Sequence, residues 1–90
     1  MKKIHPSSQF KRDYKRYRNN PEKLKDLKVI IDLLANESPI PPIYKPHKLT
    51  GEYKGCLECH IQNDFLLIWF DPEKDVIELV RMGSHSELFK

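Results

Sequence analysis

Three of the four histidines in the chain lie in its second half, near other side chains that exchange protons or bind phosphate. His47, His60 and His85 fall in predicted loops or at predicted strand ends, as do Asp64 and Arg81. Functional residues gather at such positions because a rigid scaffold holds them there. Histidine donates and accepts protons near neutral pH, and arginine binds a phosphate through two parallel hydrogen bonds. These residue types therefore indicate acid–base chemistry on a phosphate-containing substrate.

Each of these residues, taken alone, also has a structural interpretation. A single surface histidine usually has no function, and His5 is a further example outside the group. Arg81 shares one face of a predicted strand with Ile77 and Leu79, where it would equally well pair with a carboxylate. The chemistry depends on whether the fold brings the side chains together.

A predicted β-hairpin carries two of these side chains. Its second strand, residues 65–70, is apolar at every position and too short to span a membrane, which is typical of a central strand. A three-residue loop at 61–63 places Asn63 where a type I turn with a bulge requires positive φ. In this register His60 and Asp64 lie directly opposite each other, with Cβ atoms about 5 Å apart. A slip of one residue would put them on opposite faces.

A short edge strand and a first helix are predicted before the hairpin. The strand covers residues 2–5, Pro6 interrupts the backbone donors, and Ser7 or Ser8 offers the helix N-cap. Aromatic residues at helical spacing predict the buried stripe: Phe10, Tyr14 and Tyr17. Basic residues cover the rest of the helix: Lys11, Arg12, Lys15, Arg16 and Arg18.

A second amphipathic helix is predicted from Pro21, with Asn20 as N-cap, to about Asn36. Its apolar positions are Leu24, Leu27, Ile30, Ile31 and Leu34. Together the two helices predict a helical hairpin. Four prolines within residues 38–46 then predict an extended, polyproline-like crossover that leads to a loop at 47–51.

Three antiparallel strands complete the predicted fold, at residues 53–61, 64–70 and 76–82, with a turn at 71–74. The tail leaves the sheet at Gly83, and Leu88 anchors it to the body. The order β-α-α-β-β-β predicts an α+β protein in which the helical hairpin packs on one face of a mainly antiparallel sheet.

Length and composition predict one soluble domain over residues 1–90. The chain is 39% hydrophobic and 32% charged, and a chain of this length buries only a small core. Neither a signal-peptide core after Met1 nor a transmembrane-length apolar run is evident. We therefore expect a cytoplasmic protein without a membrane partner.

The net charge of +3 is unevenly distributed. Residues 1–30 hold ten Lys/Arg and three Asp/Glu, a balance of +7, whereas 31–60 sum to −1 and 61–90 to −3. This asymmetry indicates either a polyanionic partner, such as nucleic acid or an acidic protein, or simply a solvated helical face.

A cysteine pair precedes His60 in the string Cys-Leu-Glu-Cys-His. The string matches haem attachment, and Cys-x-x-Cys alone also suits redox chemistry or zinc. Haem attachment requires export, and strand alternation would send Cys59 and His60 to opposite faces. Structural zinc requires a second ligand pair, which is missing. We therefore expect Cys56 and Cys59 to be reduced packing residues, and we expect no metal and no cofactor.

Three motifs together resemble the YafQ branch of the RelE/ParE superfamily of toxin–antitoxin toxins. They are His47-x-Leu49-x-Gly51, then Glu58-x-His60-x-x-x-Asp64 leading into Leu67-Ile68, and Arg81-x-Gly83-Ser84-His85-Ser86-x-Leu88-Phe89. The resemblance covers nearly the whole chain. It implies a microbial toxin that cleaves mRNA, often on the ribosome, and that a cognate antitoxin neutralises. It also implies contact with operator DNA only through the antitoxin complex.

The functional positions that the resemblance implies are His47, His60, Asp64, Arg81, His85 and Phe89. A tryptophan follows the aspartate in some members of the family, whereas Phe65 does so here. The implied reaction is metal-independent cleavage by 2′-hydroxyl attack on the adjacent phosphate. His85 is the expected general acid, and the base is either His60 with Asp64 or His47. Arg81 would stabilise charge on the phosphorane.

Substrate contacts are expected from aromatic and basic side chains. Phe89, helped by Tyr53 or Phe65, would stack on a base. Basic residues of the first helix would follow the RNA backbone or receive an acidic antitoxin segment: Lys11, Lys15 and Arg16. Two other functions remain alternatives, a noncatalytic ParE-like toxin that inhibits a protein and a module that helps an antitoxin to occupy its operator. Neither requires the histidines.

Overall fold

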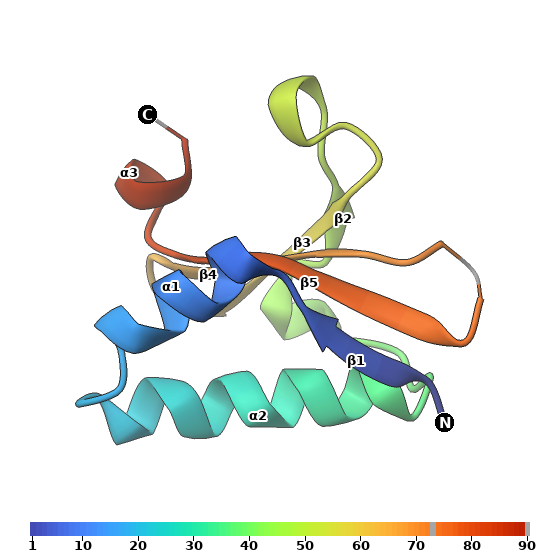
Figure 1. Cartoon of the computed structure of the whole chain (residues 1–90), viewed down its shortest axis with the longest axis horizontal. Coiled ribbons are helices and arrows are strands. Elements are labelled where there is room, and N and C mark those ends of the chain that lie inside the picture. Colours follow the sequence, from blue (N-terminus) through green and yellow to red (C-terminus); the bar gives the residue numbers. More distant parts are fainter. Residues whose placement is uncertain (73, 90) are drawn as a thin grey trace.

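The computed structural model describes residues 1–72 and 74–89 and contains one mixed sheet of five strands (Figure 1). The strand order is β1-β5-β4-β3-β2, with β1 parallel to β5 and every other pair antiparallel. The elements are β1 (Lys3–Pro6), α1 (Ser8–Arg16), α2 (Pro21–Ala35), β2 (His47–Lys48), β3 (Leu57–Gln62), β4 (Phe65–Phe70), β5 (Val76–Gly83) and α3 (His85–Leu88). The predicted α+β class and the mainly antiparallel sheet are confirmed.

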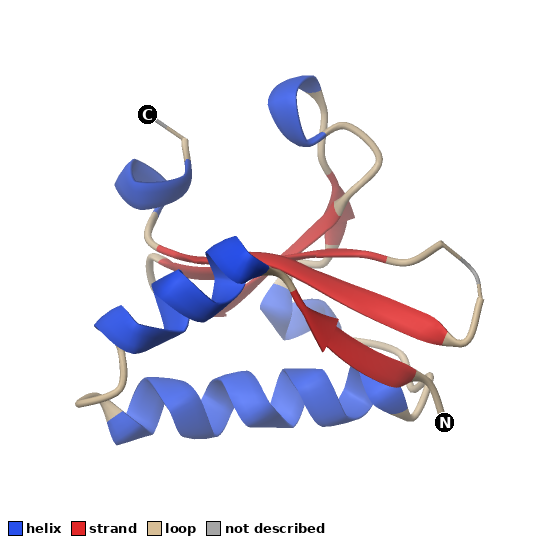
Figure 2. Cartoon of the chain, in the orientation of Figure 1, coloured by secondary structure: helices blue, strands red, loops and turns tan. Residues whose placement is uncertain are grey.

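Both faces of the sheet are covered. As a result, the central strand β4 is buried at every position from Phe65 to Trp69. One face packs against α1 and α2, which contribute the apolar side chains Phe10, Leu27, Ile30 and Leu34. On the other face Leu66 and Ile68 pack against Leu88 of α3. Figure 2 shows α2 and α3 on opposite sides of the sheet. The site described below lies on the α3 side.

The first helix begins as predicted but turns a different side toward the sheet. Ser7 caps it, since its hydroxyl accepts a hydrogen bond from the Phe10 N–H. The predicted burial of Tyr14 is wrong, because this residue is 42% exposed. Asp13 is fully buried instead. A carboxylate tolerates burial only with partners, and Asp13 has Arg81 of β5 as its partner. The helix ends at Arg16, so that Tyr17 and Arg18, which were predicted within it, follow its last turn.

The second helix agrees closely with its prediction. It starts at Pro21, directly after Asn20, and ends at Ala35. Proline suits the first helical position because the N–H that it lacks would have no partner there. Leu27, Ile30 and Leu34 are buried against the sheet, as the apolar spacing predicted.

The proline-rich crossover is less extended than predicted. A short 3₁₀ turn forms at Pro42–Tyr44, and Lys45 follows it with a positive φ of 50°. His47–Lys48, predicted as loop, pairs instead with β3 as the short edge strand β2. The next predicted strand starts four residues late, at Leu57, because a 3₁₀ turn at Gly51–Tyr53 and Gly55 at φ 93° interrupt an extended chain.

The β3–β4 hairpin forms, but the predicted register is wrong. His60 pairs with Leu66 and Gln62 with Phe65, with a bulge between His60 and Gln62. Asp64, and not Asn63, has the positive φ of 53°. His60 and Asp64 are therefore not opposed. The turn predicted at 71–74 includes residue 73, which lies outside the described residues.

The tail contains a short helix that the sequence analysis did not predict. Gly83, the last residue of β5, has a φ of 146°, and a Cβ there would lie 2.7 Å from Glu87 Oε1. The Ser84 hydroxyl accepts from the Glu87 N–H, and the Glu87 carboxylate accepts from the Ser84 N–H. This capping box starts α3. Leu88 is buried and anchors the tail, as predicted.

No helix in the described part of the chain has the length and apolar character that crossing a membrane requires.

Candidate active site

The three histidines of the second half converge, although they come from three different elements. His47 lies on β2, His60 on β3 and His85 on α3. The ring centroids of His47 and His60 are 6.0 Å apart, and those of His60 and His85 are 5.7 Å apart. The fold therefore brings the three imidazoles together. His60 is the middle member.

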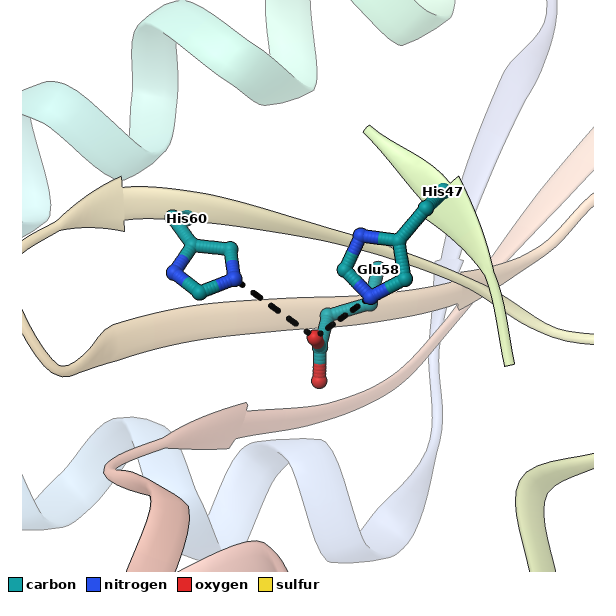
Figure 3. A group of neighbouring side chains, drawn as sticks. All are labelled: His47, Glu58 and His60. Atoms are coloured by element: carbon teal, nitrogen blue, oxygen red, sulfur yellow. Dashed lines mark ion pairs between the residues drawn. The ribbon is translucent and has the colours of Figure 1, made fainter. Parts of the chain in front are cut away.

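A buried carboxylate connects His47 and His60 (Figure 3). Glu58 Oε1 lies 3.1 Å from His47 Nε2 and 3.9 Å from His60 Nε2. Glu58 is only 3% exposed, and its Oε2 has no hydrogen-bond partner among the described residues. The sheet explains the arrangement, since His47 pairs with Glu58 across β2 and β3. Glu58 and His60, two residues apart on one strand, point to the same face.

Glu58 belongs to one of the motifs named above, but no function was predicted for it. The signal that could have found it is the i, i+2 spacing of a carboxylate and a histidine on one strand. The position of His47 opposite Glu58 could not be predicted, because residues 47–51 were predicted as a loop and β2 has only two residues. Glu58 is thus the site residue that sequence reasoning missed.

Asp64 pairs with His85 rather than with His60. Asp64 Oδ1 accepts hydrogen bonds from the backbone N–H and from Nδ1 of His85, each at 2.9 Å. These bonds lower the pKa of the Asp64 carboxyl below its usual value, and the bond from the backbone N–H makes the largest contribution. Because Nδ1 of His85 is engaged, proton exchange with a substrate falls to Nε2. Asp64 therefore fixes the orientation of the imidazole.

Arg81 reaches the same region but is held by structural partners. Its Nε and Nη2 donate to the buried Asp13 carboxylate at 2.7 and 3.1 Å. Its Nη1 donates to the Tyr53 hydroxyl at 3.3 Å. The hydrogen bonds to Asp13 are the main cause of a raised pKa for the guanidinium. The prediction that Arg81 could pair with a carboxylate is confirmed. Only its Nη1 atom faces Tyr53.

The aromatic candidates divide into exposed and buried rings. Phe89 is 42% exposed and lies 5.6 Å from Tyr53, edge to face, and 6.1 Å from His85. Phe65 is fully buried and packs 4.9 Å from Tyr17. The expectation that Phe65 stacks on a base is therefore wrong, because β4 is covered on both faces. Phe89 and Tyr53 remain as an aromatic wall beside His85.

The basic residues of α1 have two different surroundings. Lys11 and Lys15 are exposed and line a shallow apolar hollow with Phe10 and Tyr14. Arg16 instead faces the tail, where its Nη1 lies 3.4 Å from Glu87 Oε2. The structure thus separates Arg16 from the two lysines.

The cysteines have the predicted packing role. Both are free thiols, and Cys59 is fully buried. Burial, with a smaller contribution from Glu58, raises the pKa of Cys59 to about 12. A different set is able to hold a metal ion: the donor atoms of His47, Glu58 and His60 all lie within 4.8 Å of one another.

Comparison with known proteins agrees with the fold. The family model described as the bacterial toxin of a type II toxin–antitoxin system, YafQ, matches residues 2–90. The chain is 33% identical to the mRNA interferase toxin YafQ of Escherichia coli K12 over 87 residues, which cover 96% of this chain and 94% of that protein.

Two solved structures are similar over the whole fold. One is the E. coli DinJ–YafQ complex, with a TM-score of 0.88, 32% identity and full coverage of both chains. The other is a metal-bound toxin from Helicobacter pylori, with a TM-score of 0.87, 41% identity and coverage of 99% of this chain and 100% of that one.

A five-stranded α+β fold with converging histidines and carboxylates on one face defines the class as the small toxins of type II toxin–antitoxin systems. Within that class, the chain belongs to the YafQ family.

Proposed function

We propose that the protein is a single-domain toxin that cleaves mRNA in the cytoplasm and is neutralised by a cognate antitoxin. The observation that carries the proposal is the convergence of His47, His60 and His85 around two carboxylates. The name of the E. coli relative, mRNA interferase toxin, supports the substrate. The solved DinJ–YafQ complex from E. coli supports the antitoxin partner. Cleavage on the ribosome, and operator binding only through the antitoxin complex, belong to the same proposal.

The reaction that suits these groups is an internal transesterification. The ribose 2′-oxygen attacks the adjacent phosphorus and loses its proton to a base. The bond from phosphorus to the 5′-oxygen breaks, and that oxygen takes a proton from an acid. The products are a 5′-hydroxyl end and a 2′,3′-cyclic phosphate. Because two proton transfers suffice, residues of this chain supply the reaction without a metal.

His85 is the proposed general acid, since Asp64 holds its Nδ1 and leaves Nε2 to meet the leaving oxygen. The base is proposed on the other side, at His47 or His60, where Glu58 lies within 3.1 and 3.9 Å of the two Nε2 atoms. Asp64 has no part in the base, because it contacts His85 and not His60. When the imidazole accepts a proton it becomes positively charged, and a neighbouring carboxylate stabilises that charge.

The remaining expected residues contribute binding or charge. The Nη1 edge of Arg81 would stabilise the phosphorane, and the exposed ring of Phe89, beside Tyr53, would stack on a base. Lys11 and Lys15 would meet RNA phosphates or an acidic antitoxin segment. Arg16 has a structural role in the tail and is a weaker candidate.

Single-turnover cleavage of RNA tests the proposal, with ribosomes supplied if free RNA is not cut and with a strong chelator present throughout. We expect 5′-hydroxyl and cyclic phosphate ends. If folded wild-type protein yields no cut, while both it and His85→Gln inhibit growth fully, a noncatalytic ParE-like toxin is correct. If neither inhibits growth but the protein increases operator binding by the antitoxin, the operator-binding module is correct.

A further inference from the structure

The helix that carries His85 is too short to hold its own position. α3 has only four residues, His85–Leu88, and an isolated helix of that length is not stable in water. Its far end is anchored, because Leu88 is buried and its carbonyl accepts a hydrogen bond from the Tyr53 hydroxyl at 3.3 Å. One anchor leaves the short helix free to tilt, so the orientation of His85 depends on a second contact.

The pair of His85 with Asp64 is not a sufficient second contact by itself. The His85 side chain is 55% exposed and the Asp64 side chain is 57% exposed. Water competes for hydrogen bonds at such a surface, and an exposed ion pair holds its partners weakly. We therefore looked for a less exposed contact that fixes the backbone on both sides of His85.

Glu87 makes that contact. Its Oε1 accepts a hydrogen bond from the Ser84 N–H at 2.8 Å, which closes the capping box around His85. The same oxygen accepts a hydrogen bond from the Tyr17 hydroxyl at 2.5 Å. Glu87 Oε2 lies 3.4 Å from Arg16 Nη1, but that pair is more exposed and contributes little. Tyr17 is thus the principal link between Glu87 and the rest of the protein.

Tyr17 is itself held by the core. Its ring packs 4.9 Å from the fully buried Phe65 of β4, and the Lys23 ammonium lies 5.5 Å from the ring centroid. Burial, followed by the hydrogen bond to Glu87, raises the pKa of Tyr17, so its hydroxyl remains a donor at neutral pH. Tyr17 packs with the core on the α1 and α2 side, whereas α3 packs on the opposite side. The Tyr17–Glu87 hydrogen bond therefore links the two layers.

We propose that Tyr17 and Glu87 are positioning residues, whose hydrogen bond holds α3 where His85 can act as the general acid. The catalytic part rests on the proposed function. Both the N–H and Nδ1 of His85 meet one oxygen of Asp64 at 2.9 Å, and a tilt of α3 would break this two-point contact. A misplacement of about 1 Å can reduce a reaction rate about 100-fold.

Hydrogen exchange of the His85 amide, on the full chain, tests the positioning without RNA. Tyr17→Phe keeps the ring on Phe65 and removes only the hydroxyl. We expect the His85 amide to exchange about fivefold to tenfold faster in this variant, because one hydrogen bond that holds α3 is lost. The amide of Leu67, in the central strand, and the melting temperature should stay close to wild type. Tyr14→Phe is the matched control, because it removes a hydroxyl from an exposed side chain of α1.

Single-turnover cleavage tests the catalytic part, with ribosomes supplied if free RNA is not cut. The rate at saturating RNA should fall about tenfold to 100-fold in Tyr17→Phe, with RNA affinity unchanged. In a His85→Gln background the same substitution should have no further effect, because Tyr17 acts through His85. Glu87→Gln keeps an acceptor oxygen and should retain more activity than Glu87→Ala.

A modified RNA separates positioning of the acid from a general loss of structure. When sulfur replaces the leaving 5′-oxygen, the bond from phosphorus to sulfur breaks and a thiolate departs without a proton, since thiols have a pKa of roughly 8.5. Wild type, Tyr17→Phe and His85→Gln should therefore cleave this RNA at similar rates.

Three results would overturn the positioning role. They are wild-type exchange of the His85 amide in folded Tyr17→Phe, additive losses of rate in the double variant, and an equal loss of rate in Tyr17→Phe on the sulfur-containing RNA. Failure of the folded wild type to cleave either RNA would instead contradict the proposed function itself, whatever the exchange result.

Discussion

Asp13 of α1 and Arg81 of β5, 68 residues apart in the chain, form a two-point ion pair in which the carboxylate has no exposed surface. The same carboxylate accepts a hydrogen bond from the Met82 N–H at 3.2 Å. Asp13 therefore secures both the side chain of Arg81 and the backbone beside it, and it fixes α1 against the strand that leads to His85.

Removing the charge of Asp13 should destabilise the fold. Asp13→Asn leaves the largely buried Arg81 without its anionic partner, and breaking a buried pair in this way costs roughly 3 kcal/mol. Urea denaturation measures the loss. Asp32→Asn is the control, because it breaks the exposed Lys28–Asp32 pair and should cost less than about 1 kcal/mol. Equal losses in the two variants would show that the Asp13 pair is no stronger than a surface pair.

His85→Gln should remove chemistry and leave binding intact. Glutamine keeps a similar size but does not act as an acid near neutral pH, so single-turnover cleavage should fall by about 100-fold or more. RNA affinity and the melting temperature should stay close to wild type, since His85 is exposed. Wild-type cleavage by the folded variant would transfer the acid role to His47 or His60.

Phe89→Ala should have the opposite pattern. Loss of one base–aromatic stack weakens RNA binding by about 1–3 kcal/mol, while the rate at saturating RNA is retained. Fluorescence anisotropy provides the affinity. Val29→Ala is the control, because Val29 is also an exposed apolar side chain, at 45%, but lies on α2. Loss of rate without loss of affinity would mean that Phe89 positions His85, whose ring is 6.1 Å away.

Charge reversal at Lys11 and Lys15 tests the basic face of α1. The double variant to glutamate should weaken RNA or ribosome binding and reduce its salt dependence, by about 0.7 in the log–log slope for each lost contact to single-stranded RNA. Cleavage at saturating substrate should persist. Arg16 is left unchanged, because it contacts Glu87 of the tail. If neither the affinity nor the slope changes, the two lysines serve the antitoxin or are simply solvated.

Glu87 should make stability depend on pH in the acidic range. Burial raises the pKa of its carboxyl, but hydrogen bonds from Ser84 and Tyr17 outweigh burial and lower it below 4.5. A lowered pKa means that the carboxylate stabilises the fold above the unfolded value and that this contribution is lost as pH falls through the folded value. The stability difference between wild type and Glu87→Gln should therefore be largest at pH 6 and shrink below about pH 4.5. A constant difference from pH 6 to pH 3 would contradict this assignment.

The elements with strong local patterns were predictable from the sequence. Helix α2 has the expected apolar spacing and an N-terminal proline, and β4 is an uninterrupted apolar run. Both patterns arise from burial against a sheet, which depends little on distant residues. The three histidines and Arg81 could be proposed as site residues from their residue types and their predicted positions near element ends, and the fold brings the three imidazoles together.

The pairings within the site could not be predicted, because they depend on single-residue shifts. The bulge in β3 and the positive φ at Asp64 move that carboxylate from His60 to His85. The burial of Asp13 in place of Tyr14 depends on Arg81, which lies far away in the sequence. Short elements such as β2 and α3 have too few residues for a periodic pattern, and so the partner of Glu58 was missed.

β1 cannot join the sheet until β5 has been synthesised, because Lys3 pairs with Val76 and both long helices and three strands lie between them. Such distant pairing gives a high contact order, which slows folding because chain entropy is lost before the contacts form. His85 follows β5 directly, so the proposed acid is in place only after the slow step. The side chains of the proposed site therefore come together only in a chain that already includes β5 and the tail.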